Sequence, residues 1–74
     1  VDVMIIVGGK NSGNTRRLYQ ISSSLNPRSY HVETAEELKP EWFVGVQRVG
    51  ITAGASTPDW IIEQVKSKVQ ELLS

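Results

Sequence analysis

The run VDVMIIV at residues 1–7 constrains the fold more than any other stretch of the chain. From Val3 onward every side chain in it is apolar, so both faces of a strand formed here would have to be buried. Strands of this kind are typical of parallel sheets that are covered by helices. Gly8 and Gly9 end the run. We therefore expect a central strand in a parallel sheet.

The stretch 14–25 has the spacing of an amphipathic helix. Leu18, Ile21 and Leu25 fall on one helical stripe, and the charged side chains between them would meet water. The helix should stop before Pro27, because proline disfavours a helical conformation in the residue that precedes it.

Residues 58–73 form the strongest predicted helix. Pro58 suits the first helical position, and Thr57 suits the N-cap. The two tryptophans, Trp42 and Trp60, are expected to fill the interface between sheet and helix. The apolar face of the helix consists of Ile61, Ile62, Val65, Val69, Leu72 and Leu73.

Two further strands are predicted at residues 29–33 and 46–53. Between them, Thr34 and Glu37 have the spacing of a capping box, which predicts a short helical turn that ends before Pro40. Strands and helices thus alternate along the chain, which indicates an α/β fold with a small parallel sheet flanked by helices in a three-layer sandwich. Placing the most apolar strand in the middle gives the strand order 2-1-3.

Length and composition limit what the chain can be and bind. We expect residues 1–74 to form a single α/β domain, and the start at Val1 without a methionine predicts that it is a piece of a longer protein. Eight basic residues balance eight acidic ones, so no net charge attracts nucleic acid or a membrane. The chain has no cysteine and one histidine, which excludes disulfides and thiolate metal ligands within these residues. We expect a soluble intracellular protein.

Two loops carry the candidate chemistry: GGKNSGNT at residues 8–15 and GASTPD at residues 54–59. In the order 2-1-3, both loops leave the carboxyl ends of neighbouring strands, where open α/β sheets bind their ligands. Each loop also feeds a helix N-terminus, which favours anions. The neutral donors in the loops are Asn11, Ser12, Asn14, Ser56 and Thr57, and Gly9, Gly13 and Gly54 allow backbone amides to approach a ligand closely. The loops therefore predict a site for a phosphate or a diphosphate.

A second interpretation explains the same residues without a ligand. Serine, asparagine and threonine before a helix are capping residues, and glycine after a strand makes a turn. Neither loop is a Walker A motif or a G-x-G-x-x-G motif. Asp59 in a first helical turn favours the helix dipole, and His31 suits a packed or edge position in a strand. The chain could therefore be a small α/β interaction or regulatory module that binds no ligand.

The segments VDVMIIVGGKNSGNTRRLY, SYHVETAEELKPEWF and VGITAGASTPDWIIEQV, in this order, resemble the C-terminal part of the LytB-type 4-hydroxy-3-methylbut-2-enyl diphosphate reductases. The resemblance implies part of the last of three α/β domains, in an enzyme that reductively dehydroxylates its substrate to isopentenyl and dimethylallyl diphosphate in the non-mevalonate pathway. It implies a [4Fe-4S] cluster in the full-length enzyme, held by cysteines that this chain lacks, so that the chain alone would be inactive.

The resemblance also implies partners and site residues. The partners are the isoprenoid diphosphate, the remaining domains of the same enzyme and an external electron donor, in the cytoplasm or, in a plant, the plastid stroma. The diphosphate contacts of the family fall on Ser12, Asn14 and Ser56. Gly13 stands where many members have a second serine, so it would contribute a backbone donor in place of a hydroxyl. No catalytic residue and no metal ligand of the family falls within this chain.

Overall fold

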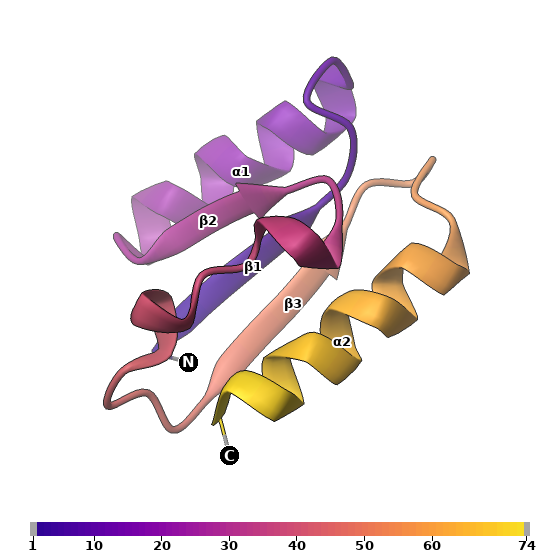
Figure 1. Cartoon of the computed structure of the whole chain (residues 1–74). Helices are drawn as coiled ribbons and strands as arrows, with labels where there is room; N and C mark the ends of the chain where they lie inside the picture. The colour runs from indigo at the N-terminus through magenta and orange to yellow at the C-terminus, as the bar shows by residue number, and fades with distance from the viewer. Residues whose placement is uncertain (1, 74) are drawn as a thin grey trace.

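Three parallel strands form the centre of the molecule, in the order β2-β1-β3 (Figure 1). The computed structural model describes residues 2–73. The elements along the chain are β1 (Val3–Val7), α1 (Gly13–Leu25), β2 (Ser29–Val32), the 3-10 turns η1 (Ala35–Glu37) and η2 (Pro40–Phe43), β3 (Val49–Ala53) and α2 (Asp59–Leu73). The expected α/β fold and the strand order 2-1-3 are confirmed.

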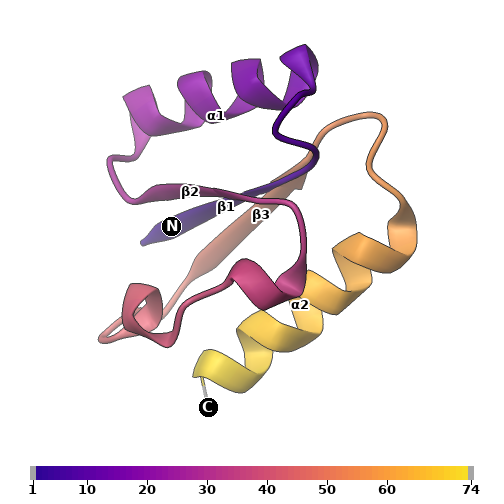
Figure 2. The same cartoon turned by 45° about the horizontal axis from the view of Figure 1, so that its top comes forward.

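The sheet is the middle one of three layers. One of its faces is covered by α1, and the other is covered by α2 together with the two 3-10 turns (Figure 2). Within residues 2–73, neither helix combines the length and the apolar character needed to cross a bilayer. The expected three-layer sandwich is confirmed.

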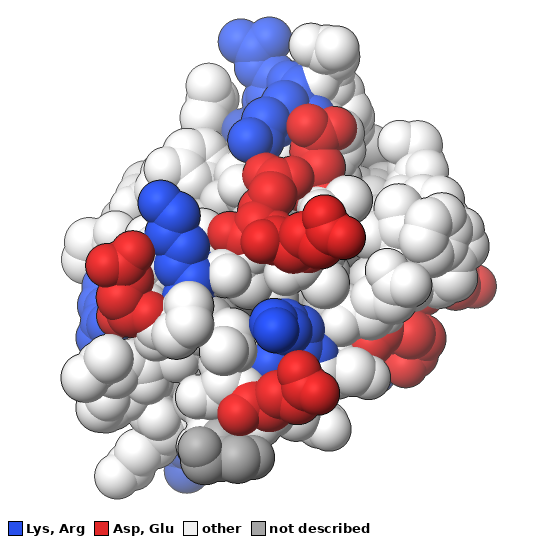
Figure 3. All heavy atoms as spheres, in the orientation of Figure 1, with Lys and Arg blue, Asp and Glu red and all other residues white. Residues whose placement is uncertain are grey.

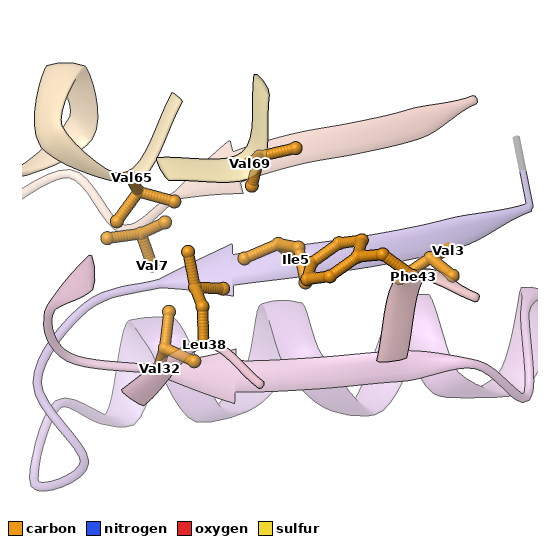
Figure 4. Close-up of a cluster of buried hydrophobic side chains, with 8 residues drawn as sticks. All are labelled: Val3, Ile5, Val7, Val32, Leu38, Phe43, Val65 and Val69. Carbon is orange, nitrogen blue, oxygen red and sulfur yellow. The ribbon is translucent and has the colours of Figure 1, made fainter. Parts of the chain in front are cut away.

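β1 is buried on both faces, as its sequence requires. Its alternate residues Val3, Ile5 and Val7 point toward α2 and the 3-10 turns, where Phe43 lies beside Val3 and Ile5 (Figure 4). Ile6 points to the opposite face, beneath α1, and is 0% exposed. The core on the α2 side comprises Val3, Ile5, Val7, Val32, Leu38, Phe43, Val65 and Val69.

The three strands end level with one another. Val7 lies opposite Val32 of β2 and opposite Ala53 of β3. Because parallel strands share one direction, the segments that follow Val7 and Ala53 leave the sheet at the same edge. This register places the two candidate loops side by side.

β3 is shorter than the expected strand 46–53. The carboxylate of Asp2 accepts hydrogen bonds from the amides of Gln47 at 3.0 Å and Arg48 at 3.1 Å. These two amides are therefore bound to a side chain and do not extend the β3 ladder. The predicted start of the first strand at Val1 lies outside the described residues.

The predicted packing of the two tryptophans is half right. Trp42 is partly buried and stacks on Tyr30, with ring centroids 4.1 Å apart and an angle of 6° between the planes. Trp60 is 62% exposed, so its expected place in the interface is wrong. It precedes the buried Val69 by nine residues, or about two and a half helical turns, and so points away from the sheet.

The apolar stripe of α1 is only partly covered. Ile21 is 50% exposed and Leu25 is 83% exposed, whereas Leu18 is half-buried. α1 packs mainly on β1 and β2, so the described sheet offers little surface to the last turns of the helix. A hollow of about 280 Å³ lies there, lined by Met4, Ser22, Leu25 and Asn26.

The predicted capping box forms only in part. The short helical turn is present as η1, but the side chain of Thr34 makes no capping hydrogen bond. Glu37 does reach back, and its carboxylate accepts a hydrogen bond from the amide of Glu33 at 2.9 Å. In a 3-10 turn of three residues, the backbone carbonyl of Thr34 takes the amide of Glu37 at 3.2 Å, so the capping role of the Thr34 hydroxyl is wrong.

The contrast between Ile5 and Leu25 gives a test of the fold. Ile5→Ala removes a side chain that is 0% exposed and should lower the free energy of unfolding by about 2–5 kcal/mol, because it leaves a cavity. Leu25→Ala, at a position that is 83% exposed, should change it by less than about 0.5 kcal/mol. Urea denaturation measures both values. Equal losses would contradict the assignment of the core.

Candidate anion-binding site

Two loops lie against each other at the carboxyl edge of the sheet. The first loop (residues 8–12) follows β1, and the second loop (residues 54–58) follows β3; Figures 1 and 2 show both at the same end of the strands. The carbonyl of Val7, the last residue of β1, attaches the second loop next to the first, because it accepts hydrogen bonds from the Gly54 amide and from the Thr57 hydroxyl, both at 3.1 Å. The expected meeting of the two loops is confirmed.

Ser12 is the N-cap of α1, with φ −81° and ψ 117°. Its hydroxyl oxygen accepts a hydrogen bond from the amide of Thr15 at 3.3 Å. A serine hydroxyl can accept one hydrogen bond and still donate its own proton. Capping therefore leaves the Ser12 proton available, and the two interpretations of this residue are compatible.

Gly13 and Asn14 begin α1 and are exposed. Their amides belong to the first helical turn, where a helix supplies no carbonyl partners. Apart from its chain neighbours and the backbone of its own helix, no atom lies within 4 Å of the place where a side chain on Gly13 would begin, so this position is open to an approaching group. The start of α1 thus presents two amides, the hydroxyl of Ser12 and the amide group of Asn14.

In the second loop, the hydroxyl of Ser56 is exposed, whereas the hydroxyl of Thr57, the predicted N-cap, is used inside the fold. Thr57 is not the N-cap of α2, since its hydroxyl donates to Val7 and the helix begins at Asp59 after Pro58. The predicted cap and the predicted helix start at Pro58 are therefore wrong, because the sheet edge takes the Thr57 hydroxyl. Ser56 is exposed, and no hydrogen bond found within residues 2–73 uses its hydroxyl.

A hollow of about 230 Å³ lies between the ends of the strands. Its lining consists of Gly8, Gly9, Glu33, Thr34, Ser56, Thr57, Pro58 and Ile61. Ser56 thus lines this hollow, whereas Ser12, the N-cap of α1, and Asn14, in its first turn, do not. The structure brings the three predicted contact residues to one edge without placing all three in one pocket.

The charges near the loops have both signs, since the exposed Arg16 and Arg17 follow the first loop and Glu33 lines the hollow. Nζ of Lys10, the one cation of the first loop, lies 2.9 Å from Oε1 of Glu37, and this hydrogen bond raises the pKa of Lys10. Burial raises the pKa of Glu37, but hydrogen bonds from Lys10 and from the Glu33 amide outweigh it and hold the pKa below its ordinary 4.5. Figure 3 shows acidic side chains gathered over η1 beside basic ones. Within the two loops themselves, neutral donors therefore supply most of any attraction for an anion.

Two residues that the sequence did not single out as site residues also support the loops. Nε2 of His31 lies 2.9 Å from the carbonyl oxygen of Gly8, which can only accept, so this nitrogen carries the proton. His31 thereby ties the first loop to β2, and the expected packed or edge position in a strand is confirmed, since His31 is half-buried in the edge strand β2. Thr15 is 0% exposed beneath both loops. Thr15 is not part of the apolar stripe of the predicted helix, so the sequence pattern did not indicate that it would be buried.

The fold by itself places the chain in a structural class. The chain is an open parallel α/β domain, a class in which ligands bind outside the carboxyl ends of the strands, where the strand order reverses. A protein-family model described as LytB protein matches residues 1–70. The chain belongs to this family, and the expected resemblance is confirmed.

Relatives of known identity agree with this assignment. The chain is 81% identical over 72 residues to the 4-hydroxy-3-methylbut-2-enyl diphosphate reductase of Aquifex aeolicus, covering 97% of this chain and 25% of that protein. It is 59% identical to the enzyme of the same name from Geobacter sulfurreducens, over 96% of this chain and 25% of the relative. The chain therefore spans about a quarter of the length of these relatives.

A solved structure shows the same fold. It is a structure of (E)-4-hydroxy-3-methyl-but-2-enyl diphosphate reductase, described as the terminal enzyme of the non-mevalonate pathway. It matches this chain with a TM-score of 0.94 and 82% identity, over 96% of this chain and 25% of that one.

The pairing of Lys10 with Glu37 predicts a pH dependence. The pKa of Glu37 is lower in the folded protein, so the ionised carboxylate stabilises the fold above its ordinary pKa of 4.5, and this contribution is lost as the pH falls through the lowered value. Glu37→Gln should therefore reduce the drop in melting temperature below pH 4.5, as thermal unfolding at several pH values would show. Part of the drop in melting temperature should remain in this variant, because the pKa of Asp2 is also lowered in the folded protein by hydrogen bonds from the Gln47 and Arg48 amides. An unchanged drop would contradict this role of Glu37.

Proposed function

We propose that this chain is the diphosphate-binding part of a 4-hydroxy-3-methylbut-2-enyl diphosphate reductase, which reductively dehydroxylates its substrate to isopentenyl and dimethylallyl diphosphate. One observation carries the proposal: the Val7 carbonyl holds the loops after β1 and β3 together, so that two helix N-termini and their neutral donors share one edge. The 81% identity with the Aquifex aeolicus reductase supports this substrate class.

Each predicted contact has its own donor. Ser12 and Ser56 would donate hydroxyl protons to phosphate oxygens, Asn14 would donate its side-chain amide, and Gly13 its backbone amide. A hydrogen bond to a charged group contributes about 1.5–3 kcal/mol. Several such bonds, together with two helix N-termini, could hold a diphosphate without a free cation in either loop.

The redox chemistry lies outside these residues in this proposal. The chain contains no cysteine, and within residues 2–73 no cluster of acidic, histidine or cysteine side chains could hold a metal ion. The described residues therefore do not fit an iron–sulfur cluster. We assign the [4Fe-4S] cluster to other domains of the reductase and the electrons to an external donor, so that this chain alone has no activity. The bacterial relatives favour the cytoplasm as its compartment.

Ser56→Ala tests the proposal directly. In the full-length reductase that contains this segment, the variant should weaken the affinity for the diphosphate substrate by about tenfold to a hundredfold, the loss expected for one charge-assisted hydrogen bond. The melting temperature should not change, because Ser56 is exposed. Ser67→Ala, at an exposed serine of α2 away from both loops, is the matched control and should leave the affinity unchanged.

Binding to the chain itself separates the two interpretations. Pyrophosphate titration, followed by amide chemical shifts, should perturb residues 9–14 and 54–57 selectively if the loops hold a diphosphate. If no amide chemical shift changes, and the affinity is unchanged in Ser56→Ala, the proposal would be contradicted and an interaction module that binds no ligand would be favoured.

Gly13→Ser should restore a donor that many members of the family carry. The open space around Gly13 admits the side chain, so the fold should tolerate it. The added hydroxyl should raise the affinity for pyrophosphate by about threefold to tenfold, measured by calorimetric titration. Gly13→Ala makes the same backbone change without the hydroxyl and is the control. An equal gain in both variants would place the effect in the backbone.

A further inference from the structure

Thr15 is a buried polar side chain at the junction of the two loops. It is 0% exposed, and its hydroxyl oxygen is the buried side-chain polar atom within residues 2–73 that has no hydrogen-bond partner. A buried hydroxyl without a partner destabilises a fold, so hydrogen bonding alone would favour valine, which carries a methyl group in place of the hydroxyl. The presence of threonine calls for another explanation.

Two glycines, one in each loop, face this hydroxyl. A Cβ atom on Gly8 or on Gly54 would overlap the Thr15 hydroxyl oxygen at a distance that real Cβ atoms do not adopt. In glycine this direction carries only a hydrogen, so the oxygen rests against the backbone of both loops. Gly8 directly follows β1 and Gly54 directly follows β3. Thr15 is thus inserted between the two strand ends from the first turn of α1.

We propose that Thr15 is a positioning residue, whose hydroxyl oxygen sets the separation of the two loops that hold the diphosphate. An oxygen atom is smaller than a methyl group, so it lets the two glycine backbones approach more closely than valine would. Gly8 and Gly54 lack side chains because the oxygen occupies the space of their Cβ atoms. The inference deepens the proposed function and rests on it.

Kinetics of the full-length reductase test this role. Thr15→Val places a methyl group where the oxygen lies and should push the loops apart, which raises KM for the diphosphate substrate by about tenfold to a hundredfold. The melting temperature should change little, because losing an unpaired buried hydroxyl offsets the strain of a larger methyl group against the two glycines. In the proposed function the reacting end of the substrate lies elsewhere, so kcat should also change little. Thr15→Ser keeps the oxygen, and its KM should stay within about threefold of the original value.

Each result of these assays decides the question. Thr52→Val in β3 makes the same exchange at a threonine that is not among the nearest atoms to the Cβ positions of Gly8 and Gly54, and it should leave KM unchanged. An unchanged KM in Thr15→Val, or an equal rise in Thr15→Ser, would overturn the role of the oxygen. If Thr15→Val weakens substrate affinity and Ser56→Ala does not, Thr15 positions the loops but the proposed contact of Ser56 with the diphosphate is wrong. If Ser56→Ala weakens the affinity and Thr15→Val does not, the proposed function is supported and the positioning role of Thr15 is rejected.

A pair of glycine variants tests the contact without any ligand. Gly54→Ala should lower the melting temperature of the protein, because its Cβ would overlap the Thr15 hydroxyl. Adding Thr15→Ala should restore most of the loss, since the nearest remaining atoms, Cβ and Cα of Thr15, lie at 3.5 and 3.7 Å. Gly8→Ala should not be restored in this way, because Gly8 has φ +157° and its Cβ would still meet the Cβ of Thr15 at 3.1 Å. Absence of rescue at Gly54 would overturn the proposed contact.

Discussion

The candidate site depends on the burial of the carboxyl end of β1. Val7 is 0% exposed, and its carbonyl would be costly to leave unpaired. The second loop satisfies it twice, through the Gly54 amide and the Thr57 hydroxyl. The amide of Gly8, the next residue, donates to Val32 of β2 at 3.0 Å. One buried strand end therefore joins all three strands and determines where both loops lie.

The loops combine structural and binding roles in the same atoms. Ser12 caps α1 with its oxygen and retains its proton, whereas Thr57 uses its hydroxyl on the sheet edge and leaves Ser56 exposed. Because Lys10 is paired with Glu37, neutral donors carry the attraction in the proposed site. Each such donor contributes modestly, so binding depends on several of them being held at the right separation. This makes the packing beneath the loops, around Thr15, as important as the donors themselves.

Local patterns predicted much of the fold correctly. The doubly apolar run that became β1, together with the alternation of strands and helices, predicted a central strand, the order 2-1-3 and the meeting of the loops. Predictions that assigned a single side chain to a partner were less successful. Trp60 is exposed because the face of α2 that meets the sheet is the one with Val65 and Val69. The predicted N-cap role of Thr57 is wrong because its hydroxyl donates a hydrogen bond to the carbonyl of Val7 in β1.

By itself, the amino-acid sequence determined the elements, their order and the types of donor in each loop, because periodicity and turn chemistry depend on near neighbours along the chain. Only the tertiary structure decided how each donor is used. Thr57 and Val7 are 50 residues apart in the chain, and the space at Gly54 is occupied by Thr15 of α1. Hydrogen bonds and steric contacts of this kind depend on distances in space, which no local pattern contains.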